Sequence, residues 1–244
     1  MNAVKQNQSS IWQRFRQLKQ SQGIKGILAT TWSYFWMRFA GLGFGGRVAT
    51  WLATCWAPPF KKRKALARYY AKGYISPTAT VDHTNLQLGS NIFIGDRVTI
   101  FQHPQGGLID LGMRVHLHND NVLETGEGGN LTIGRNTHVQ VGCQFSALQG
   151  SIQIGKGVQI APECIFDAHP VHQQAYQSSE TSSSAKIIVD DDVWIGHGTT
   201  VLSGVHIGQG AVIGSGAMVT NDIPAKAIAV GIPARVVSMR VSTQ

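Results

Sequence analysis

Aliphatic residues recur at every sixth position through the second half of the chain. Between residues 195 and 224 five of them stand six apart, and glycine directly follows three of the five. The same spacing occurs earlier in triplets that are separated by 9 to 11 residues. The positions are Ile195, Val201, Ile207, Ile213 and Val219, after Leu88, Ile94, Ile100; Leu111, Leu117, Leu123; Ile133, Val139, Phe145; and Ile154, Ile160, Phe166. A period of six excludes an ordinary sandwich, whose strands alternate with a period of two.

The six-residue period has a direct physical interpretation. Each unit forms a short strand and a turn, and three units close one triangular coil around the inward aliphatic side chains. Glycine and small residues suit the corners, where crowding or a positive φ excludes larger side chains. Strands pair between coils, so each coil is supported only by its neighbours. The pattern therefore predicts an all-β solenoid over residues 74–224, with a polar loop extruded at 167–186 and a C-terminal tail at 225–244.

The first 72 residues differ from the rest in charge and composition. They contain 13 lysines and arginines and no acidic residue, whereas the whole chain of 244 residues has a net charge of +8. Five of the six tryptophans also lie there, in apolar stripes with helical spacing. We expect residues 1–73 to form a basic helical extension that caps the first coil, contacts an anionic membrane surface, or does both. No nucleic-acid-binding motif accompanies the charge, so we expect no nucleic-acid partner.

The sequence carries no sign of export or of a bilayer span. The first 23 residues are polar and basic, and the longest uncharged runs near the start have 12 and 13 residues, against roughly 20 for a spanning helix. Three scattered cysteines do not form a disulfide framework. We therefore expect a cytoplasmic protein, either free or peripheral to the inner face of the cell membrane.

The end of the repeat resembles a known family. The run Asp192-Val-Trp-Ile-Gly-His-Gly-Thr-Thr-Val-Leu-Ser-Gly-Val and the later Val230-Gly-Ile-Pro-Ala-Arg are similar to the signature end of the hexapeptide-repeat acyltransferases. The branch most resembled contains galactoside, maltose, nodulation-factor and polysaccharide O-acetyltransferases. This resemblance implies a left-handed parallel β-helix, acetyl-coenzyme A as co-substrate, a sugar or polysaccharide acceptor and a homotrimer. It implies no metal.

The polar loop after Phe166 carries the candidate catalytic base. It opens with His169-Pro-Val-His172. A lone histidine in a turn more often has an ordinary surface role, but the resemblance places the family's base at His169. The imidazole suits this role because its pKa lies near neutrality. His172 is a weaker candidate for a second essential residue.

The resemblance also assigns residues to a coenzyme A groove. Trp194 lines the thioester arm, and we expect it to face outward because it is too large for the small corner positions. Packing against the loop is the alternative for this tryptophan. The backbone amide of His197 faces the thioester carbonyl, where it can stabilise an oxyanion. The polar and cationic groove positions are Ser215, Thr220, Asn221 and Arg235, with additional charge from Lys226.

Other functions are compatible with parts of the sequence. The acceptor can be the amine of an amino-sugar instead of a hydroxyl, and a β-helix can also persist as an inactive scaffold. The carbonic anhydrases of the γ class share the fold and need three histidines at a zinc ion, for which His116, His118 and His138 are the candidates. We expect His116 and His118 to point to opposite faces of their strand, which argues against a shared metal.

Overall fold

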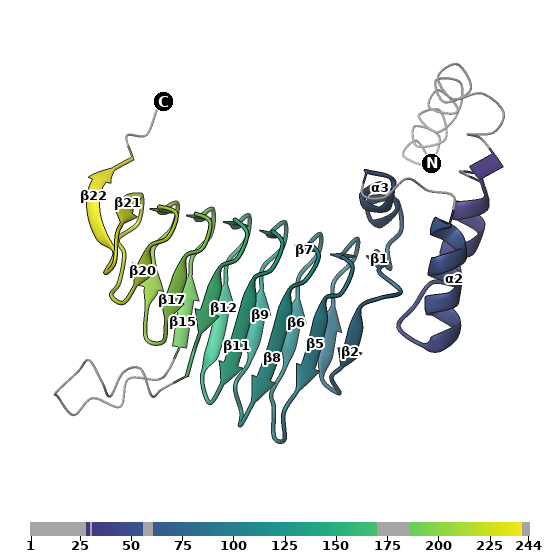
Figure 1. Cartoon of the computed structure of the whole chain (residues 1–244), viewed down its shortest axis with the longest axis horizontal. Coiled ribbons are helices and arrows are strands. Elements are labelled where there is room, and N and C mark those ends of the chain that lie inside the picture. The colour runs from purple at the N-terminus through teal and green to yellow at the C-terminus, as the bar shows by residue number, and fades with distance from the viewer. Residues whose placement is uncertain (1–27, 30, 56–60, 170–185, 241–244) are drawn as a thin grey trace, which may run out of the picture. The chain divides into compact units, whose positions relative to one another are not determined.

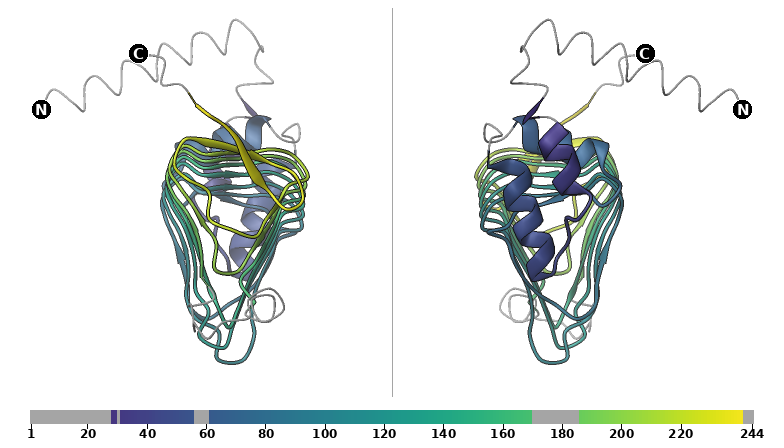
Figure 2. Two further views of the ribbon diagram at one scale, coloured as in Figure 1. Left: turned by 90° about the vertical axis from the view of Figure 1, so that its left-hand side faces the viewer. Right: turned by 90° about the vertical axis from the view of Figure 1, so that its right-hand side faces the viewer.

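The structure, a computed structural model, describes residues 28–29, 31–55, 61–169 and 186–240. The chain divides into two compact units, Met1–Leu66 and Ala67–Gln244. Each is described by itself below. The second unit is the predicted left-handed parallel β-helix, and Figure 2 shows its triangular cross-section, with successive coils stacked along the axis.

Three sheets form the sides of the β-helix, and successive strands visit them in turn (Figure 1). Sheet A contains β1 (Tyr74–Ile75), β4 (Phe93–Ile94), β7 (His116–Leu117), β10 (His138–Val139), β13 (Gln159–Ile160), β16 (Trp194–Ile195), β19 (Val212–Ile213), β21 (Ala227–Val230) and β22 (Arg235–Met239). Sheet B contains β2 (Thr80–Asp82), β5 (Thr99–Gln102), β8 (Val122–Gly126), β11 (Gln144–Leu148), β14 (Ile165–Asp167), β17 (Thr200–Leu202) and β20 (Met218–Val219). Sheet C contains β3 (Leu86–Leu88), β6 (Ile109–Leu111), β9 (Leu131–Ile133), β12 (Ser151–Ile154), β15 (Lys186–Val189) and β18 (His206–Ile207).

The repeating aliphatic residues form the core as the period predicts. Along sheet B, for example, Ile100, Leu123, Phe145, Phe166 and Val201 stack in register and are at most 1% exposed. The rings of Phe145 and Phe166 are parallel, with 4.7 Å between their centroids. Burial of this continuous column is the main stabilising term for such a solenoid, because each coil covers the apolar face of the next.

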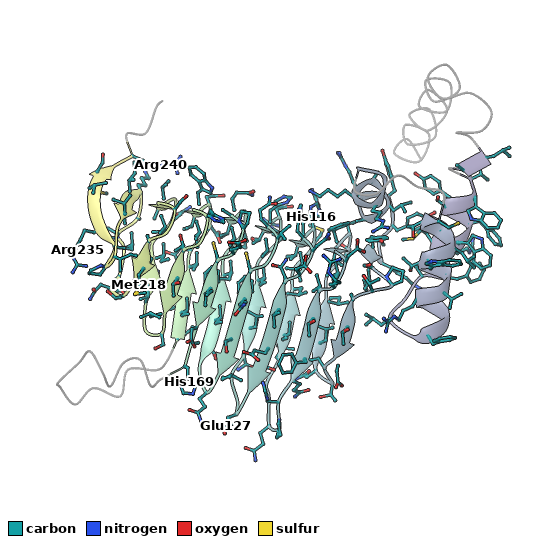
Figure 3. The ribbon with its side chains drawn as sticks, viewed as in Figure 1. His116, Glu127, His169, Met218, Arg235 and Arg240 are labelled. Carbon is teal, nitrogen blue, oxygen red and sulfur yellow. The ribbon has the colours of Figure 1, made fainter. Side chains whose placement is uncertain are left out.

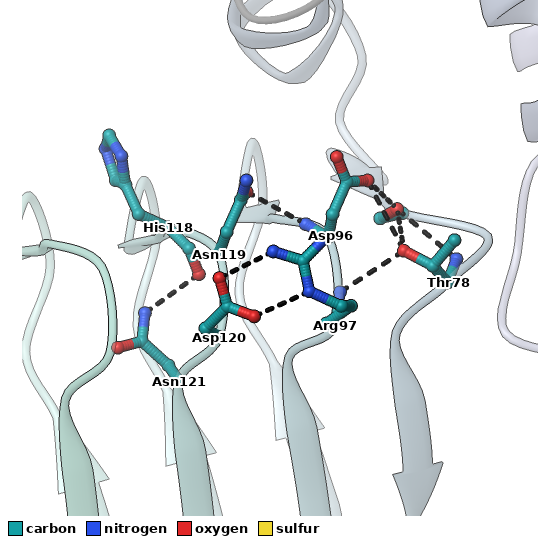
Figure 4. A network of polar contacts seen from close by, with 8 residues as sticks. Thr78, Asp96, Arg97, His118, Asn119, Asp120 and Asn121 are labelled. Atoms are coloured by element: carbon teal, nitrogen blue, oxygen red, sulfur yellow. Dashed lines mark hydrogen bonds and ion pairs between the residues drawn. The ribbon is translucent and has the colours of Figure 1, made fainter.

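The corners between sheets A and B, here called the A/B edge, are tied together by polar side chains at the start of the β-helix (Figure 4). The guanidinium of Arg97 binds both carboxylate oxygens of Asp120 one coil further on, each at 2.7 Å. The backbone N–H of Arg97 donates to Thr78 Oγ1, one coil before. The Arg97 hydrogen bonds lower the pKa of Asp120 below its ordinary value. These contacts link the corners of three successive coils.

The last coil departs from the expected C-terminal tail. In the stretch 225–244, β21 continues sheet A in parallel with β19, and β22 then turns back to pair antiparallel with β21. The hexapeptide rhythm ends at residue 224, but the strand-forming segment Ala227–Val230 still adds one more strand to the sheet. The reversed strand β22 is exposed along its whole length.

The first unit contains short helices. Residues 31–37 are helical, followed by α2 (Phe44–Thr54), while α3 (Lys61–Tyr69) spans the boundary between the units. The buried face of α2 consists of small residues, including Ala49 and Ala53. Trp32 Nε1 donates to the Leu52 carbonyl and Ser33 Oγ to the Ala53 carbonyl, which ties the two helices together. Residues 1–27, with the first predicted stripe, lie outside the described residues.

Candidate active site

His169 lies where sheet B ends and the chain leaves the regular coil. Its backbone N–H donates to Asp167 Oδ1 at 3.0 Å, and Asp167 is the last residue of β14. Asp167 is held in register between Ser146 and Leu202 on the neighbouring strands. The corner between sheets B and C, called the B/C edge, therefore presents His169 half-buried at its surface (Figure 3). His172 and the remainder of the loop lie outside the described residues.

Two rows of outward-facing residues run along sheet B toward His169. The first row contains Phe101, Glu124, Ser146 and Asp167, which pair in register on four neighbouring strands. The second row lies two residues further along the chain and contains Gly126 and Leu148, which pair in register, with His103 and His169 just beyond the ends of β5 and β14. The residues that precede the first row are the buried core positions, so both rows face outward. We call these eight residues the sheet B strip.

Glu124 occupies the middle of the sheet B strip and joins its neighbours. Its Oε1 accepts a hydrogen bond from Ser146 Oγ at 2.7 Å, and its Oε2 lies 3.2 Å from His103 Nε2. The Glu124 side chain is 22% exposed and that of His103 is 42% exposed. Ser146 donates to the carboxylate rather than to the imidazole, so the three residues are not arranged as a nucleophilic triad. Glu124, Ser146 and His103 were not among the site residues predicted from the sequence.

The A/B edge carries a second group of expected residues. Trp194 faces outward on sheet A, as predicted, and is 55% exposed. His197 follows at the corner, where its Nε2 lies 3.7 Å from Glu163 Oε2 and its carbonyl accepts from Gly216 N at 2.7 Å. Ser215 lies directly beside it, since a Cβ on Gly196 would be 2.6 Å from Ser215 N. Within the described parts of the chain, the backbone N–H groups of His197 and Ser215 have no acceptor.

The remaining expected residues lie near the C-terminal end of the β-helix. Thr220 follows β20 and donates from Oγ1 to Asn221 Oδ1 at 2.9 Å, which places both on the B/C edge. Arg235 opens β22, where it pairs with Val230, and its Nη1 donates to the Ala234 carbonyl. The Arg235 side chain is exposed (Figure 3). Lys226 is also exposed, just before β21.

Within one chain, the candidate base and the expected oxyanion donors lie far apart. His169 lies at one edge of sheet B and His197 at the other, with β17 and its flanking corner residues between the two edges. Six extended residues span roughly 20 Å at about 3.3 Å per residue. The predicted base and the oxyanion donor therefore cannot act on the same carbonyl within one subunit.

The histidines of sheet A lie on one face of the sheet. Residues two apart on a strand share a face, and the rings of His116 and His118 both contact Phe93, with centroids 5.9 and 6.0 Å away. The expectation that the two point to opposite faces was wrong. His116 also packs edge-on against His138 at 4.5 Å, while His118 is only 3% exposed. Among the described residues, no three histidine, cysteine or acidic side chains are grouped closely enough to hold a metal ion.

Two of the three cysteines are buried and stacked in adjacent coils. Cys143 and Cys164 are fully buried, and both thiols lie 3.2 Å from the Ala161 carbonyl oxygen. The hydrogen-bonded thiol of Cys164 and burial both raise the pKa of the Cys143 thiol well above its ordinary value. Cys55 is exposed in the first unit. Neither buried thiol can reach a substrate on the surface of the β-helix.

Comparison with known proteins identifies the repeat. Residues 186–221 match the bacterial transferase hexapeptide family (six repeats). The galactoside O-acetyltransferase of Escherichia coli (strain K12) is 37% identical over 112 residues, which make up 45% of this chain and 54% of that protein. A 2,3,4,5-tetrahydropyridine-2,6-dicarboxylate N-acetyltransferase of Staphylococcus aureus (strain JH9) is 42% identical over 65 residues, 27% of each chain. The chain thus spans about half the length of the first relative and about a quarter of the second.

A solved structure shares the fold. The crystal structure of AntD, an N-acyltransferase from Bacillus cereus in complex with dTDP and 3-hydroxybutyryl-CoA, superposes with a TM-score of 0.51 at 23% identity. The match covers 64% of this chain and 83% of AntD. At this identity the match shows the fold alone.

Proposed function

We propose that this chain, whose β-helix is built from the bacterial transferase hexapeptide repeat, moves an acetyl group from acetyl-coenzyme A to a hydroxyl of a sugar. The observation that carries the proposal is the position of His169, half-buried at the B/C edge and fixed to the end of β14 through Asp167. The match to a galactoside O-acetyltransferase over 112 residues supports a sugar acceptor. A role in the synthesis of a surface polysaccharide follows from the resemblance described above.

In the proposed mechanism, His169 acts as general base. Its imidazole takes the proton from the acceptor hydroxyl as the oxygen attacks the acyl carbonyl. Backbone N–H groups such as those of His197 and Ser215 stabilise the negative charge that develops on that carbonyl oxygen. Both buried cysteines are out of reach, so transfer is direct and needs both substrates bound at once. Coenzyme A supplies the activated thioester and leaves as the free thiol.

The A/B edge has features that fit coenzyme A. Exposed Trp194 offers an apolar surface for the pantetheine arm, beside the His197 and Ser215 N–H groups that we assign to the acyl carbonyl. Arg235 is exposed at the end of β21 that faces this edge, where its guanidinium can bind the phosphates. Lys226 is exposed at the opposite end of β21, at the corner between sheets C and A. Thr220 and Asn221 lie on the B/C edge, away from this groove. We therefore assign them to the coenzyme A molecule that binds the A/B edge of a neighbouring subunit.

We further propose that the active site forms between two copies in a homotrimer. His169 and His197 lie at opposite edges of sheet B, so one subunit alone does not bring the base to the oxyanion donors. If the B/C edge of one subunit lies beside the A/B edge of the next, the base of one faces the groove of the other. A closed ring of three copies satisfies this arrangement for every site.

Acetylation of an amine is the second candidate. It is favoured by the 42% identity to an N-acetyltransferase over 65 residues. The two functions differ in the acceptor, so the experiment is a panel of neutral sugars and amino-sugars with acetyl-coenzyme A, followed through release of free thiol. Mild alkali removes an ester and leaves an amide, which distinguishes the products. Absence of thiol release with every acceptor would overturn both functions and favour the inactive scaffold.

The first unit has a surface that suits an anionic membrane. On α2 the small residues are buried, whereas large apolar side chains face outward, among them Phe44 at 86% and Trp51 at 59% exposed. Residues 1–72 carry 13 basic residues and no acid. Tryptophan and phenylalanine beside arginine and lysine are typical of interfacial helices. None of the helices in the described ranges combines the length and the hydropathy that a bilayer span requires.

A further inference from the structure

We propose that the sheet B strip is the acceptor site and that it binds an extended saccharide chain, not a single sugar. The strip consists of the eight residues defined above, from Phe101 and His103 to Asp167 and His169. This inference rests on the proposed function, because it places the acceptor beside the candidate base. It goes further by naming the surface, the substrate class and Glu124 as a residue that determines acceptor binding.

The strip is continuous with the candidate base. Asp167 ends the first row and His169 ends the second, so both rows lead to the imidazole. The in-register pairing of β5, β8, β11 and β14 holds the rows on neighbouring strands. An acceptor lying along the strip would therefore present one end to His169.

The polar groups of the strip match a ligand rich in hydroxyls. Glu124 accepts one hydrogen bond from Ser146 and contacts His103 through its other oxygen. A carboxylate has about four lone-pair positions, so both oxygens retain capacity to accept from further hydroxyl groups. The imidazole of His103 and the hydroxyl of Ser146 can each also contact a ligand. Such side chains recognise hydroxyl groups without requiring a charged ligand.

Two apolar side chains, Phe101 and Leu148, lie among these polar groups. Phe101 is half-buried in the first row, and its ring lies 4.8 Å from that of His103 between centroids. Leu148 is half-buried in the second row, on the strand next to His169. Sugar rings have apolar C–H faces that pack on aromatic and aliphatic surfaces. Gly126 has no side chain, so nothing projects from the centre of the strip. A Cβ at this position would lie 2.9 Å from Leu148 Cδ2 and crowd it.

The length of the strip selects a chain of sugars. Strands in a sheet lie about 4.8 Å apart, so three spacings separate the two ends by roughly 14 Å. A hexose ring is only about as wide as one such spacing. A monosaccharide would contact the strip next to His169 alone and would leave Glu124 and Phe101 without a role. An oligosaccharide of several sugars would contact all four strands.

The test is the dependence of acceptor kinetics on chain length. Linear oligosaccharides of one to four sugars, in galactose, glucose and mannose series, are assayed with acetyl-coenzyme A by thiol release. We expect the acceptor KM to fall by about tenfold or more from one sugar to four, one order of magnitude in affinity. Glu124→Gln should remove most of this gain, with kcat at saturating acceptor and the KM for acetyl-coenzyme A nearly unchanged.

Glu127→Gln is the matched control. Glu127 is an exposed carboxylate just beyond β8, outside the strip, and it pairs with Gln149. Its substitution should leave the length dependence intact, and the melting temperature of each variant excludes a folding defect. Equal KM values for one and four sugars, or equal effects of the two substitutions, would overturn the acceptor strip while leaving the transferase function standing. No transfer to any sugar of the panel would overturn the proposed function, and the strip with it.

Discussion

The backbone N–H of His169 donates a hydrogen bond to the carboxylate of Asp167, two residues before it, across 3.0 Å. Asp167 belongs to sheet B, where both of its neighbouring strands hold it in register. The last residue of β14 thus sets the point from which the chain that carries the imidazole leaves the coil. A residue in a polar loop is in this way positioned by the rigid β-helix.

The first prediction concerns the base. His169→Ala should lower kcat by roughly 10²–10⁴, because general-base assistance contributes about that factor. The affinity for coenzyme A, measured by calorimetry, should change little. The matched control is His206→Ala, since His206 is an exposed histidine on sheet C that pairs with Asp190 at 3.0 Å. Loss of activity in both variants to the same extent would reject the assignment.

The second prediction concerns the shared site. If base and groove come from different subunits, His169→Ala and a groove variant such as Trp194→Ala should complement each other after co-refolding. Each interface needs a base from one variant and a groove from the other, so activity should recover to about a quarter of wild type in a random mixture. Light scattering of the wild type should give a trimer. A monomer with full activity would contradict both expectations.

The third prediction tests the core through its thiols. In the native protein only Cys55 should react quickly with a thiol reagent, because Cys143 and Cys164 are buried and the pKa of Cys143 is raised. All three should react after unfolding in guanidinium chloride. Mass spectrometry of the labelled protein counts the modified residues. Rapid native labelling of Cys143 would contradict the stacking of these coils.

The fourth prediction concerns the ion pair at the A/B edge. Arg97 lowers the pKa of Asp120 in the folded protein, so the pair stabilises the fold above the ordinary aspartate pKa of about 4 and loses this effect as the pH falls through the lowered value. In Arg97→Gln the Asp120 carboxyl should titrate at a higher pH, measured by NMR. Added salt should reduce the difference, because the pair is exposed. An unchanged Asp120 titration would show that the pair does not form in solution.

The fifth prediction concerns the first unit. The full-length protein should sediment with anionic vesicles at low salt and leave them at high salt, since each cation near the surface contributes ~1 kcal/mol within a Debye length. Changing Lys61, Lys62, Arg63 and Lys64 together to Gln should weaken binding, as should Phe44→Ser with Trp51→Ser. Activity on a soluble acceptor should persist in both. Sedimentation that ignores salt and lipid charge would return this unit to a capping role.

Most of the fold could be predicted because the residues that repeat every six positions are the core residues. Each inward residue, such as Leu123 or Phe145, is aliphatic or aromatic and recurs at the corresponding place in the next coil. β22 escaped prediction since it follows no period and pairs by reversing direction. His116 and His118 were expected on opposite faces of their strand, but residues two apart on a strand lie on the same face.

The candidate site was only partly accessible to sequence. His169 was found through its resemblance to a family motif, while Glu124 and Ser146 lie 22 residues apart and meet only because their strands are adjacent. A signal did exist, since each residue of the first row follows an inward core residue of sheet B. Reading that outward position from coil to coil would have aligned Phe101, Glu124, Ser146 and Asp167.

The reversed strand β22 also changes the direction of the edge strand at the C-terminal end of sheet A. A parallel solenoid presents at each end a strand whose backbone groups invite another strand in the same direction, and repeated addition of copies would extend it without limit. At the C-terminal end of sheet A, β22 offers an antiparallel edge, which does not match the direction of β1 in a second copy. Sheets B and C still end in the parallel strands β20 and β18, so the reversal opposes head-to-tail pairing in sheet A, and a chain cut before Arg235 would lose it.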